Sequence, residues 1–410
     1  MFAALDGQKY VGHIFTNLKE NKLPTFTLLH GDVLSMLTQL EDNSVDSVVS
    51  DPPYELGFMG KGWDSTGITY SVPMWKEVLR VLKPGGHLLS FGGSRTYHRM
   101  ASAVEDAGFE IRDQIMWVYG SGFPKSLDVS KAIDKAGGAE REVVGQGKGR
   151  TGAAAQPNGG SLHSDDNYQW PGNFDITKPT TETAKQWDGW GTALKPAHEP
   201  IVVARKPLIG TVVSNVLTHG TGAINIGACR VGTEAVPSNK LEQWSGFGEL
   251  KRPAYTQTIN VGRWPANLIH DGSDEVENEF AKAGVRSPGR FPKNSGGIGT
   301  DSGIYSKGVG RDQTERTLEA VTPAKFFYCA KANKKDREEG NTHPTVKPTE
   351  LMRYLVRLVT PPSGTVLDHL CGSGSTGKAA LLEGFNFIGI EKEEGHVEIA
   401  RRRLQKVQAE

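Results

Sequence analysis

Short apolar runs alternate with amphipathic stretches in the first third of this 410-residue chain. Residues 26–29 and 45–49 are typical of buried strands, because aliphatic side chains there follow one another or alternate with small polar ones. Between them, apolar side chains in residues 33–40 recur at helical spacing. A strand, a helix and a second strand in this order predict a βαβ unit.

The same alternation continues to residue 119. A helix is predicted at 74–82, and the turn Lys83-Pro84-Gly85-Gly86 ends it. After it we expect a strand at 87–91, a helix through about Ala107 and a strand at 109–119. Strands that alternate with helices predict a mostly parallel sheet covered on both faces.

A second region of regular alternation begins near residue 326. From Leu351 to Val359, apolar residues have the i, i+3, i+4, i+7, i+8 spacing of a helix that packs on a core, and two prolines follow. A strand at 365–367, a glycine-rich loop and a strand at 387–390 come next. These segments predict another βαβ unit near the C-terminal end.

The middle of the chain differs from both regions. It is polar and rich in glycine, with one clear strand predicted near 200–206 and short β-like runs such as Thr211–Leu217. We interpret it as surface elaboration or as a variable recognition region, whose loops contact something large. The predicted division is a first core half at 24–135, an insertion at 136–324 and a second core half at 325–410.

Composition excludes several classes of protein. The 47 Lys and Arg residues balance the 47 Asp and Glu residues, so no overall basic field attracts nucleic acid. The three cysteines are far apart and form no CxxC pair, which predicts neither a disulfide framework nor a metal site. Neither a signal peptide nor a membrane-spanning run is evident, so we expect an intracellular protein without a membrane partner.

The tetrapeptide Asp51-Pro52-Pro53-Tyr54 follows the predicted strand at 45–49 directly. Open α/β sheets bind ligands at the carboxyl ends of their strands. The Asp51 carboxylate and the Pro52 carbonyl are two acceptors suited to the two hydrogens of a nucleobase amino group, whose nitrogen would then become nucleophilic. Tyr54 offers a ring on which a flipped base stacks. A strand that ends in a proline turn with a capping Asp is the plainer interpretation.

The glycine-rich loop from Gly372 to Gly377 admits three interpretations. It matches a phosphate-binding P-loop except at Ala379, where that motif needs Ser or Thr. It also has the dinucleotide spacing, with Glu391 at the end of the second strand placed to bind ribose hydroxyls. The third interpretation is an S-adenosylmethionine site, with the methionine part of the cofactor across the loop that follows Asp368. A loop that only packs a helix on a sheet is the remaining alternative.

Together, DPPY, Gly31-Asp32, HPTVKP with its helix, DHLCGSGSTG and FIGIE resemble the motif set of the β-class DNA amino-methyltransferases, in residues and in order. The resemblance covers about residues 24–122 and 328–404. It implies a doubly wound, Rossmann-like S-adenosylmethionine-dependent methyltransferase fold with permuted motif order and a large inserted recognition region. Residues 24–135 would form the catalytic half, 136–324 the target recognition region and 325–410 the cofactor-binding half.

The resemblance also implies residue roles. Asp51, Pro52 and Tyr54 would hold the target base while Pro53 shapes the turn. Asp32 would lie near the adenine of the cofactor and Glu391 on its ribose. The implied cofactor-binding residues are Asp32, His343, Thr345, Lys347, Asp368, Gly372, Ser373, Gly374, Ser375 and Glu391. The family usually has Asp-Pro-Phe where this chain has Asp368-His369-Leu370, a departure that removes a ring beside the cofactor.

The sequence therefore predicts a site-specific DNA methyltransferase that transfers a methyl group from S-adenosylmethionine to the N6 amino group of adenine after base flipping. Methylation of the cytosine N4 amino group is the alternative. A nicotinamide-dependent dehydrogenase or a non-catalytic DNA-binding module would leave DPPY unexplained. Expected partners are double-stranded DNA and, as the family allows, a second copy of the chain and a cognate restriction endonuclease. The expected location is the cytoplasm of a bacterial or phage-infected cell, at the nucleoid.

Overall fold

The computed structural model describes residues 23–57, 64–120, 122, 126–148, 173–241, 255–282, 324, 327–330 and 336–409. Much of the predicted insertion, at 149–172, 242–254 and 283–323, lies outside the described residues. No helix in the part of the chain that the structure describes is both long enough and apolar enough to cross a membrane.

The main sheet has nine strands in the order β1-β13-β12-β2-β3-β7-β4-β10-β11. Strand β7 is antiparallel to both of its neighbours, and the other pairs are parallel. The strands are β1 Phe26–His30, β2 Val45–Ser50, β3 Leu82–Phe91, β4 Glu110–Val118, β7 His198–Arg205, β10 Leu268–His270, β11 Tyr328–Cys329, β12 Thr365–Asp368 and β13 Asn386–Glu391. Strand order does not follow chain order, as the permuted fold predicts.

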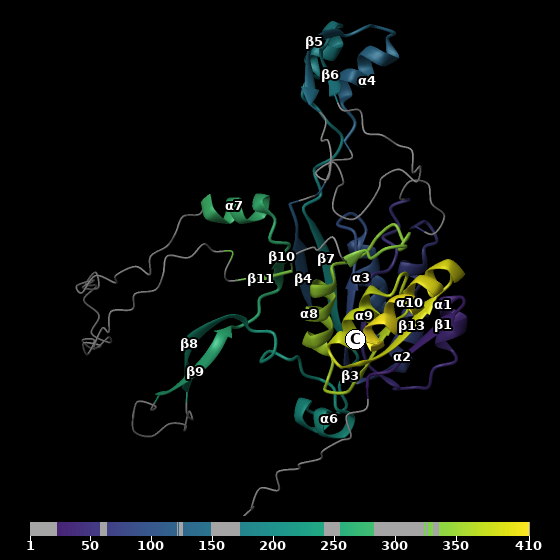
Figure 1. Ribbon diagram of the computed structural model, residues 1–410, viewed down its shortest axis with the longest axis vertical. Coiled ribbons are helices and arrows are strands. Elements are labelled where there is room, and N and C mark those ends of the chain that lie inside the picture. The colour runs from purple at the N-terminus through teal and green to yellow at the C-terminus, as the bar shows by residue number, and fades with distance from the viewer. Residues whose placement is uncertain are drawn as a thin grey trace, which may run out of the picture.

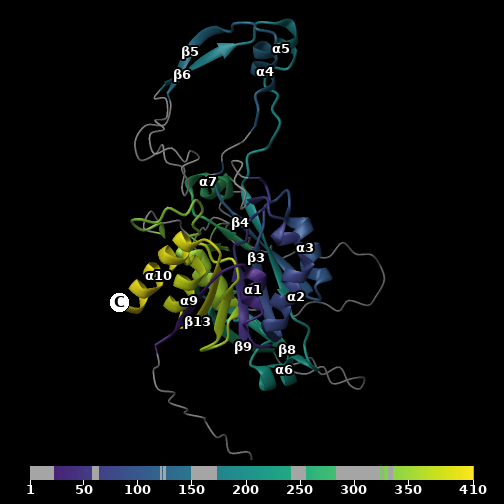
Figure 2. The ribbon, with the colours of Figure 1, turned by 90° about the vertical axis from the view of Figure 1, so that its right-hand side faces the viewer.

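Helices cover both faces of this sheet, as Figure 2 shows. One apolar cluster joins the sheet to α8, α9 and α10, and a second joins it to α1, α2 and α3. These helices are α1 Val33–Leu37, α2 Val72–Val81, α3 Tyr97–Asp106, α8 Thr349–Val359, α9 Ser375–Leu382 and α10 Glu394–Ala409. Helix α2 is typical, because the side chains that it buries, Met74, Trp75, Val78 and Val81, recur at helical spacing. The predicted doubly wound, Rossmann-like fold is therefore confirmed.

The two halves of the chain meet at the centre of the sheet. Strand β12, from near the C-terminal end, pairs with β2, from near the N-terminal end, through Val366 opposite Ser47 and Leu367 opposite Val48. Because the pairing is parallel, the carboxyl ends of both strands lie at one edge of the sheet, where ligands of this fold class bind.

The prediction of a β-like run at Thr211–Leu217 is wrong, because these residues belong to helix α6, Val212–His219. The Thr211 hydroxyl accepts from the Ser214 amide while the Ser214 hydroxyl accepts from the Thr211 amide, which forms a capping box. The buried Asn215 side chain donates to the Pro84 and Thr221 carbonyls. Capping and this tertiary anchor together override the strand propensity of the valines.

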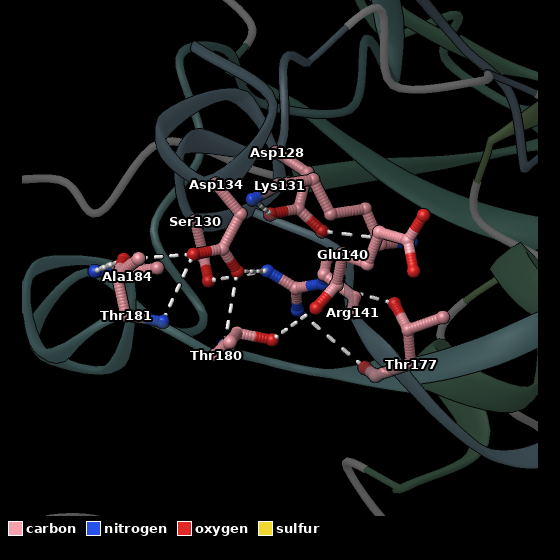
Figure 3. A network of polar contacts seen from close by, with 10 residues as sticks. All are labelled: Asp128, Ser130, Lys131, Asp134, Glu140, Arg141, Thr177, Thr180, Thr181 and Ala184. Carbon is pink, nitrogen blue, oxygen red and sulfur yellow. Dashed lines mark hydrogen bonds and ion pairs between the residues drawn. The ribbon is translucent and has the colours of Figure 1, made fainter. Parts of the chain in front are cut away.

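A small unit lies apart from the sheet in both ribbon views (Figures 1 and 2). It contains α4 Val129–Ala136, β5 Glu142–Lys148, β6 Asn173–Lys178 and α5 Glu182–Gln186. Its polar centre is drawn in Figure 3, where Arg141 donates to Asp134 at 2.8 Å and to the Ser130 hydroxyl at 3.1 Å. The fully buried Asp134 also accepts from the amides of Thr180 and Thr181, so this network holds the two helices to the hairpin.

Two further pieces come from the same middle region. Strands β8 Val231–Leu241 and β9 Tyr255–Arg263 form an antiparallel hairpin, and helix α7 Asp274–Lys282 follows β10. Strands β7 and β10 themselves belong to the main sheet. The region 136–324 thus supplies core strands as well as additions to the core.

We expect Gly377→Ala to destabilise the fold by about 1–3 kcal/mol, because a Cβ there would lie 2.5 Å from the Phe387 ring. Gly395→Ala, in α10 where a Cβ meets no atom within 4 Å, is the matched control and should be neutral or stabilising. Chemical denaturation of both variants measures the difference. Equal stability of the two variants would contradict the close packing of α9 on β13.

Candidate active site

The predicted catalytic and cofactor motifs meet at the carboxyl ends of β2 and β12. The Ser50 hydroxyl, one residue before Asp51, donates to Asp368 Oδ1 at 2.7 Å. Asp368 Oδ2 accepts from the Thr376 hydroxyl at 2.6 Å, and Oδ1 also accepts from the Leu370 amide at 3.3 Å. The Asp368 side chain therefore links the DPPY strand to the first turn of α9.

Asp368 is buried, with an exposed fraction of 2%. Burial raises the pKa of its carboxyl group to about 6, although the hydrogen bonds from Thr376 and Ser50 act in the opposite direction. An ionised Asp368 thus costs free energy, which its three hydrogen bonds offset in part.

Four polar side chains converge beside the DPPY turn. The Lys347 ammonium donates to Asp51 Oδ2 at 2.8 Å and lies 3.1 Å from Glu199 Oε2. The Tyr54 hydroxyl lies 3.0 Å from Asp51 Oδ1, 2.8 Å from Glu199 Oε2 and 3.0 Å from Lys347 Nζ. The ammonium also lies 4.9 Å from the centre of the Phe91 ring. One cation therefore sits between two carboxylates and a phenol.

Burial and the neighbouring carboxylates determine the protonation states of Tyr54 and Lys347. Burial and the carboxylates of Asp51 and Glu199 raise the pKa of Tyr54 well above its ordinary value, so the phenol stays neutral. Burial alone would lower the pKa of Lys347, but Asp51 and Glu199 raise it above its ordinary value. A protonated lysine, a neutral phenol and two carboxylates leave one net negative charge beside the turn.

Glu199 was not predicted from the sequence. It lies near the start of β7, which runs antiparallel to β3 with Ile201 opposite Phe91. The start of β7 therefore lies at the same edge as the carboxyl ends of the parallel strands. No motif surrounds Glu199, and only the direction of β7 could have shown that its side chain reaches Tyr54 and Lys347.

Hydrogen bonds to residues further along the chain fix the backbone that follows DPPY. Glu55 has a positive φ of 54°, and its amide donates to Asp64 Oδ1 at 2.9 Å. The Thr69 hydroxyl lies 3.2 Å from the Pro53 carbonyl and 3.1 Å from Glu55 Oε1. Trp75, fully buried in α2, donates its indole N–H to the Thr69 carbonyl at 2.9 Å. The turn is therefore tied to the core through several successive bonds.

Glu391 organises the glycine-rich loop from β13. One of its carboxylate oxygens accepts from the Gly372 amide at 2.8 Å, and the other accepts from the Glu393 amide at 2.8 Å. Oε1 also faces His396 Nδ1 at 3.8 Å, and the remaining lone-pair directions of the carboxylate suit the hydroxyls of a ribose. Gly372 and Gly374 have φ values of 50° and 77°, so the loop needs glycine at both positions.

His343 covers this loop from the HPTVKP segment. A Cβ at Gly372 would lie 2.7 Å from His343 Nε2, so the imidazole ring lies against the loop backbone. Its other ring nitrogen lies 2.5 Å from the Thr345 carbonyl, and its ring is 4.5 Å from that of His396. Burial, with the neighbouring His396, lowers the pKa of His343 to about 4, so His343 is neutral at pH 7.

The other predicted cofactor residues lie along the same edge. Asp32 is exposed and caps α1 by accepting from the Leu34 and Ser35 amides. It follows β1, in which His30 is the register partner of Glu391. Lys347 lies on Asp51 instead of on the loop, and its predicted approach to the methionine part of the cofactor stays a prediction. The ends of the neighbouring strands β1, β13, β12 and β2 thus present Asp32, Glu391, Asp368 and Asp51 in turn.

His369 stands where the related motif has proline, and its side chain is fully buried. Neither ring nitrogen has a hydrogen-bond partner among the described residues. The ring instead contacts Trp75 edge-on, with 5.1 Å between the ring centres. Burial lowers the pKa of His369 to about 3, so the side chain acts as a neutral aromatic residue beneath the loop.

We expect Asp368→Asn to change how stability depends on pH. The folded pKa of about 6 lies above the ordinary value of 3.8, so ionisation destabilises the wild-type protein as the pH rises between these values. Between about pH 4 and about pH 7, the free energy of unfolding of the wild type should fall by up to about 3 kcal/mol relative to that of the variant. Urea denaturation at both pH values measures this change, and parallel pH profiles would contradict it.

Comparison with known sequences identifies the family. A family model described as DNA methylase, of the N6/N4 methyltransferase type, matches residues 45–402. The chain is 31% identical over 101 residues to the type II methyltransferase M.HinfI of Haemophilus influenzae, which is 25% of this chain and 27% of the relative. It is 36% identical over 81 residues to the type II methyltransferase M2.DpnII of Streptococcus pneumoniae, which is 20% of this chain and 30% of the relative. Each alignment thus spans less than a third of the relative.

Two solved structures are also similar to this chain. The M1.HpyAVI complex with SAM matches 93% of this chain and 99% of its own, with 16% identity and a TM-score of 0.39. PvuII DNA methyltransferase, titled cytosine-N4-specific, matches 95% of this chain and 93% of its own, with 14% identity and a TM-score of 0.42. The family model spans most of the sequence and confirms the predicted family and its cofactor, S-adenosylmethionine. The chain belongs to the DNA methylase family of N6/N4 amino-methyltransferases.

Proposed function

We propose that this protein is a site-specific DNA methyltransferase that methylates the N6 amino group of adenine after base flipping. The observation that carries the proposal is the Ser50–Asp368 hydrogen bond of 2.7 Å, which sets the DPPY turn beside the glycine-rich loop. S-adenosylmethionine supplies an electrophilic methyl group when bound. Orientation of two reactants contributes much of such a transfer, and this arrangement suits it.

The residues of the loop fit the cofactor. The glycines at 372 and 374 give the loop its positive φ values, and α9 begins at Ser375 with a first turn whose amide groups suit a carboxylate. Glu391 retains acceptor capacity for ribose hydroxyls. We therefore assign the methionine part to the loop and the ribose to Glu391, with Asp32 beside the adenine.

Asp51 and the Pro52 carbonyl are proposed to accept the two hydrogens of the target amino group. This arrangement stabilises the positive charge that develops on nitrogen during alkylation. Lys347 occupies Asp51 Oδ2 at 2.8 Å, so the target must share or replace this donor. Glu199 lies 3.1 Å from the same ammonium and can retain the lysine when Asp51 turns to the base.

Adenine is favoured because Asp, and not Ser, opens the PPY motif of residues 52–54. The cytosine N4 amino group poses the same chemical problem, and the match to the family model covers both targets. Family membership argues against the nicotinamide-dependent dehydrogenase. Double-stranded DNA is the proposed substrate, at the nucleoid of a bacterial or phage-infected cell. A homodimer and a cognate restriction endonuclease stay predictions.

The proposal is tested by incubating unmethylated DNA with the protein and S-adenosylmethionine, digesting it to nucleosides and separating them by mass spectrometry. We expect N6-methyldeoxyadenosine. Asp51→Ala should lower its formation by a factor of roughly 100 to 1,000, because a preorganised acceptor is lost. Its affinity for S-adenosylmethionine, measured by calorimetry, should stay within about twofold of the wild type. N4-methyldeoxycytidine alone would refute the choice of adenine, and full activity of the variant would refute the role of Asp51.

Glu199→Gln should slow methyl transfer by roughly tenfold or more, because Asp51 would then be the only carboxylate bound to Lys347, which would compete with the amino group. The expected loss lies in the rate of single-turnover transfer, with cofactor affinity unchanged. Glu350→Gln, an exposed change on α8, is the control. A transfer rate equal to that of the control would contradict the role of Glu199.

A further inference from the structure

A buried arginine side chain, that of Arg403, contacts the glycine-rich loop. Arg403, in the last helix of the chain, has an exposed fraction of 3%. Its Nη1 donates to the Ser373 carbonyl at 2.6 Å, and lies 3.1 Å from the Ser373 hydroxyl and 3.3 Å from the Ser375 hydroxyl. Both serines belong to the loop to which we assign the methionine part of the cofactor. No sequence motif includes Arg403.

Within the described part of the chain, the guanidinium forms a single long ion pair, in which its Nε donates to Glu338 Oε1 at 3.4 Å. That carboxylate also pairs with Lys378, so it is shared between two cations. The other bond of Arg403 goes from Nη2 to the Asp336 carbonyl at 3.1 Å. Burying a charge costs several kcal/mol when its pairing is incomplete. A buried guanidinium at position 403 therefore suggests a functional contribution that offsets this cost.

The chemistry of arginine fixes the direction of these bonds. A guanidinium only donates, so the oxygens of Ser373 and Ser375 must accept from Arg403. Each hydroxyl keeps its own hydrogen and can donate it to another acceptor. Arg403 therefore leaves both serine hydroxyls as donors suited to a carboxylate.

The packing of α10 fixes the position of this cation. Gly374 has no room for a side chain, because a Cβ there would lie 3.0 Å from Ala400 Cβ. Ala400 and Arg403 are three residues apart on α10, so both face the loop from the same side of the helix. The amide groups at the start of α9 add partial positive charge at the same place.

We propose that Arg403 is a positioning residue for S-adenosylmethionine, which acts through the Ser373 and Ser375 hydroxyls to make the loop selective for the carboxylate of the methionine part. The inference rests on the proposed placement of that part on the loop. It adds a determinant that lies outside every motif of the sequence and that touches no ligand itself. The last helix of the chain thereby takes part in cofactor recognition.

The test compares two ligands by calorimetry on the full-length protein. S-adenosylmethionine carries the carboxylate, and 5′-methylthioadenosine shares the adenosine and sulfur but lacks it. Arg403→Gln should weaken binding of S-adenosylmethionine by about tenfold and leave binding of 5′-methylthioadenosine within about twofold, since a hydrogen bond to a charged group is lost only for the former. Arg401→Gln, which removes an ion pair to Glu398 within the same helix, is the matched control and should change neither.

A second comparison avoids removing the buried charge. The Ser373→Ala/Ser375→Ala double variant should show the same selective loss, and adding Arg403→Gln to it should weaken S-adenosylmethionine binding no further. Equal weakening for both ligands, or additive losses in the triple variant, would show that Arg403 only supports the fold and would overturn the inference. If the wild type bound 5′-methylthioadenosine but not S-adenosylmethionine, the proposed function would fail instead.

Discussion

The parallel pairing of β2 with β12 is the constraint on which the rest of the structure depends. It is short, with two register pairs, yet it joins segments more than 300 residues apart. The hydrogen bond from Ser50 to the buried Asp368 completes it at the edge of the sheet. Without this pairing, the DPPY turn and the glycine-rich loop would have no fixed relation, and neither could serve the other in a reaction.

The charged side chains at this edge of the sheet interact strongly because they are shielded from water. Asp51, Glu199 and Lys347 have side chains no more than 21% exposed, so their mutual charges are poorly screened. The result is a cluster with one excess negative charge next to the turn. On the other side of β12, the glycine-rich loop has a guanidinium behind it and a helix start beside it. The same loop also holds the carboxylates of Glu391 and Asp368, so charges of both signs lie in each region.

Much of the fold could be predicted from the sequence, because its core helices and strands have strong periodicity and clear ends. The parallel sheet, its two covered faces and the strand near 200–206 follow from such patterns. The Thr211–Leu217 segment was predicted wrongly, since valines suggested a strand while capping and the buried Asn215 stabilise a helix. The presence of Glu199 beside Lys347 depends on the direction of β7, which no local pattern encodes.

The order of strands also has a consequence for how the chain is made. Strands β1 and β2 follow each other in the sequence, but β13 and β12 stand between them in the sheet. A nascent chain that ends before residue 365 therefore leaves its first two strands with unfilled edges and an unclosed core. Completion of this part of the sheet must wait until β12 and β13 have left the ribosome, so termination before these strands yields a product without the paired β2–β12 centre.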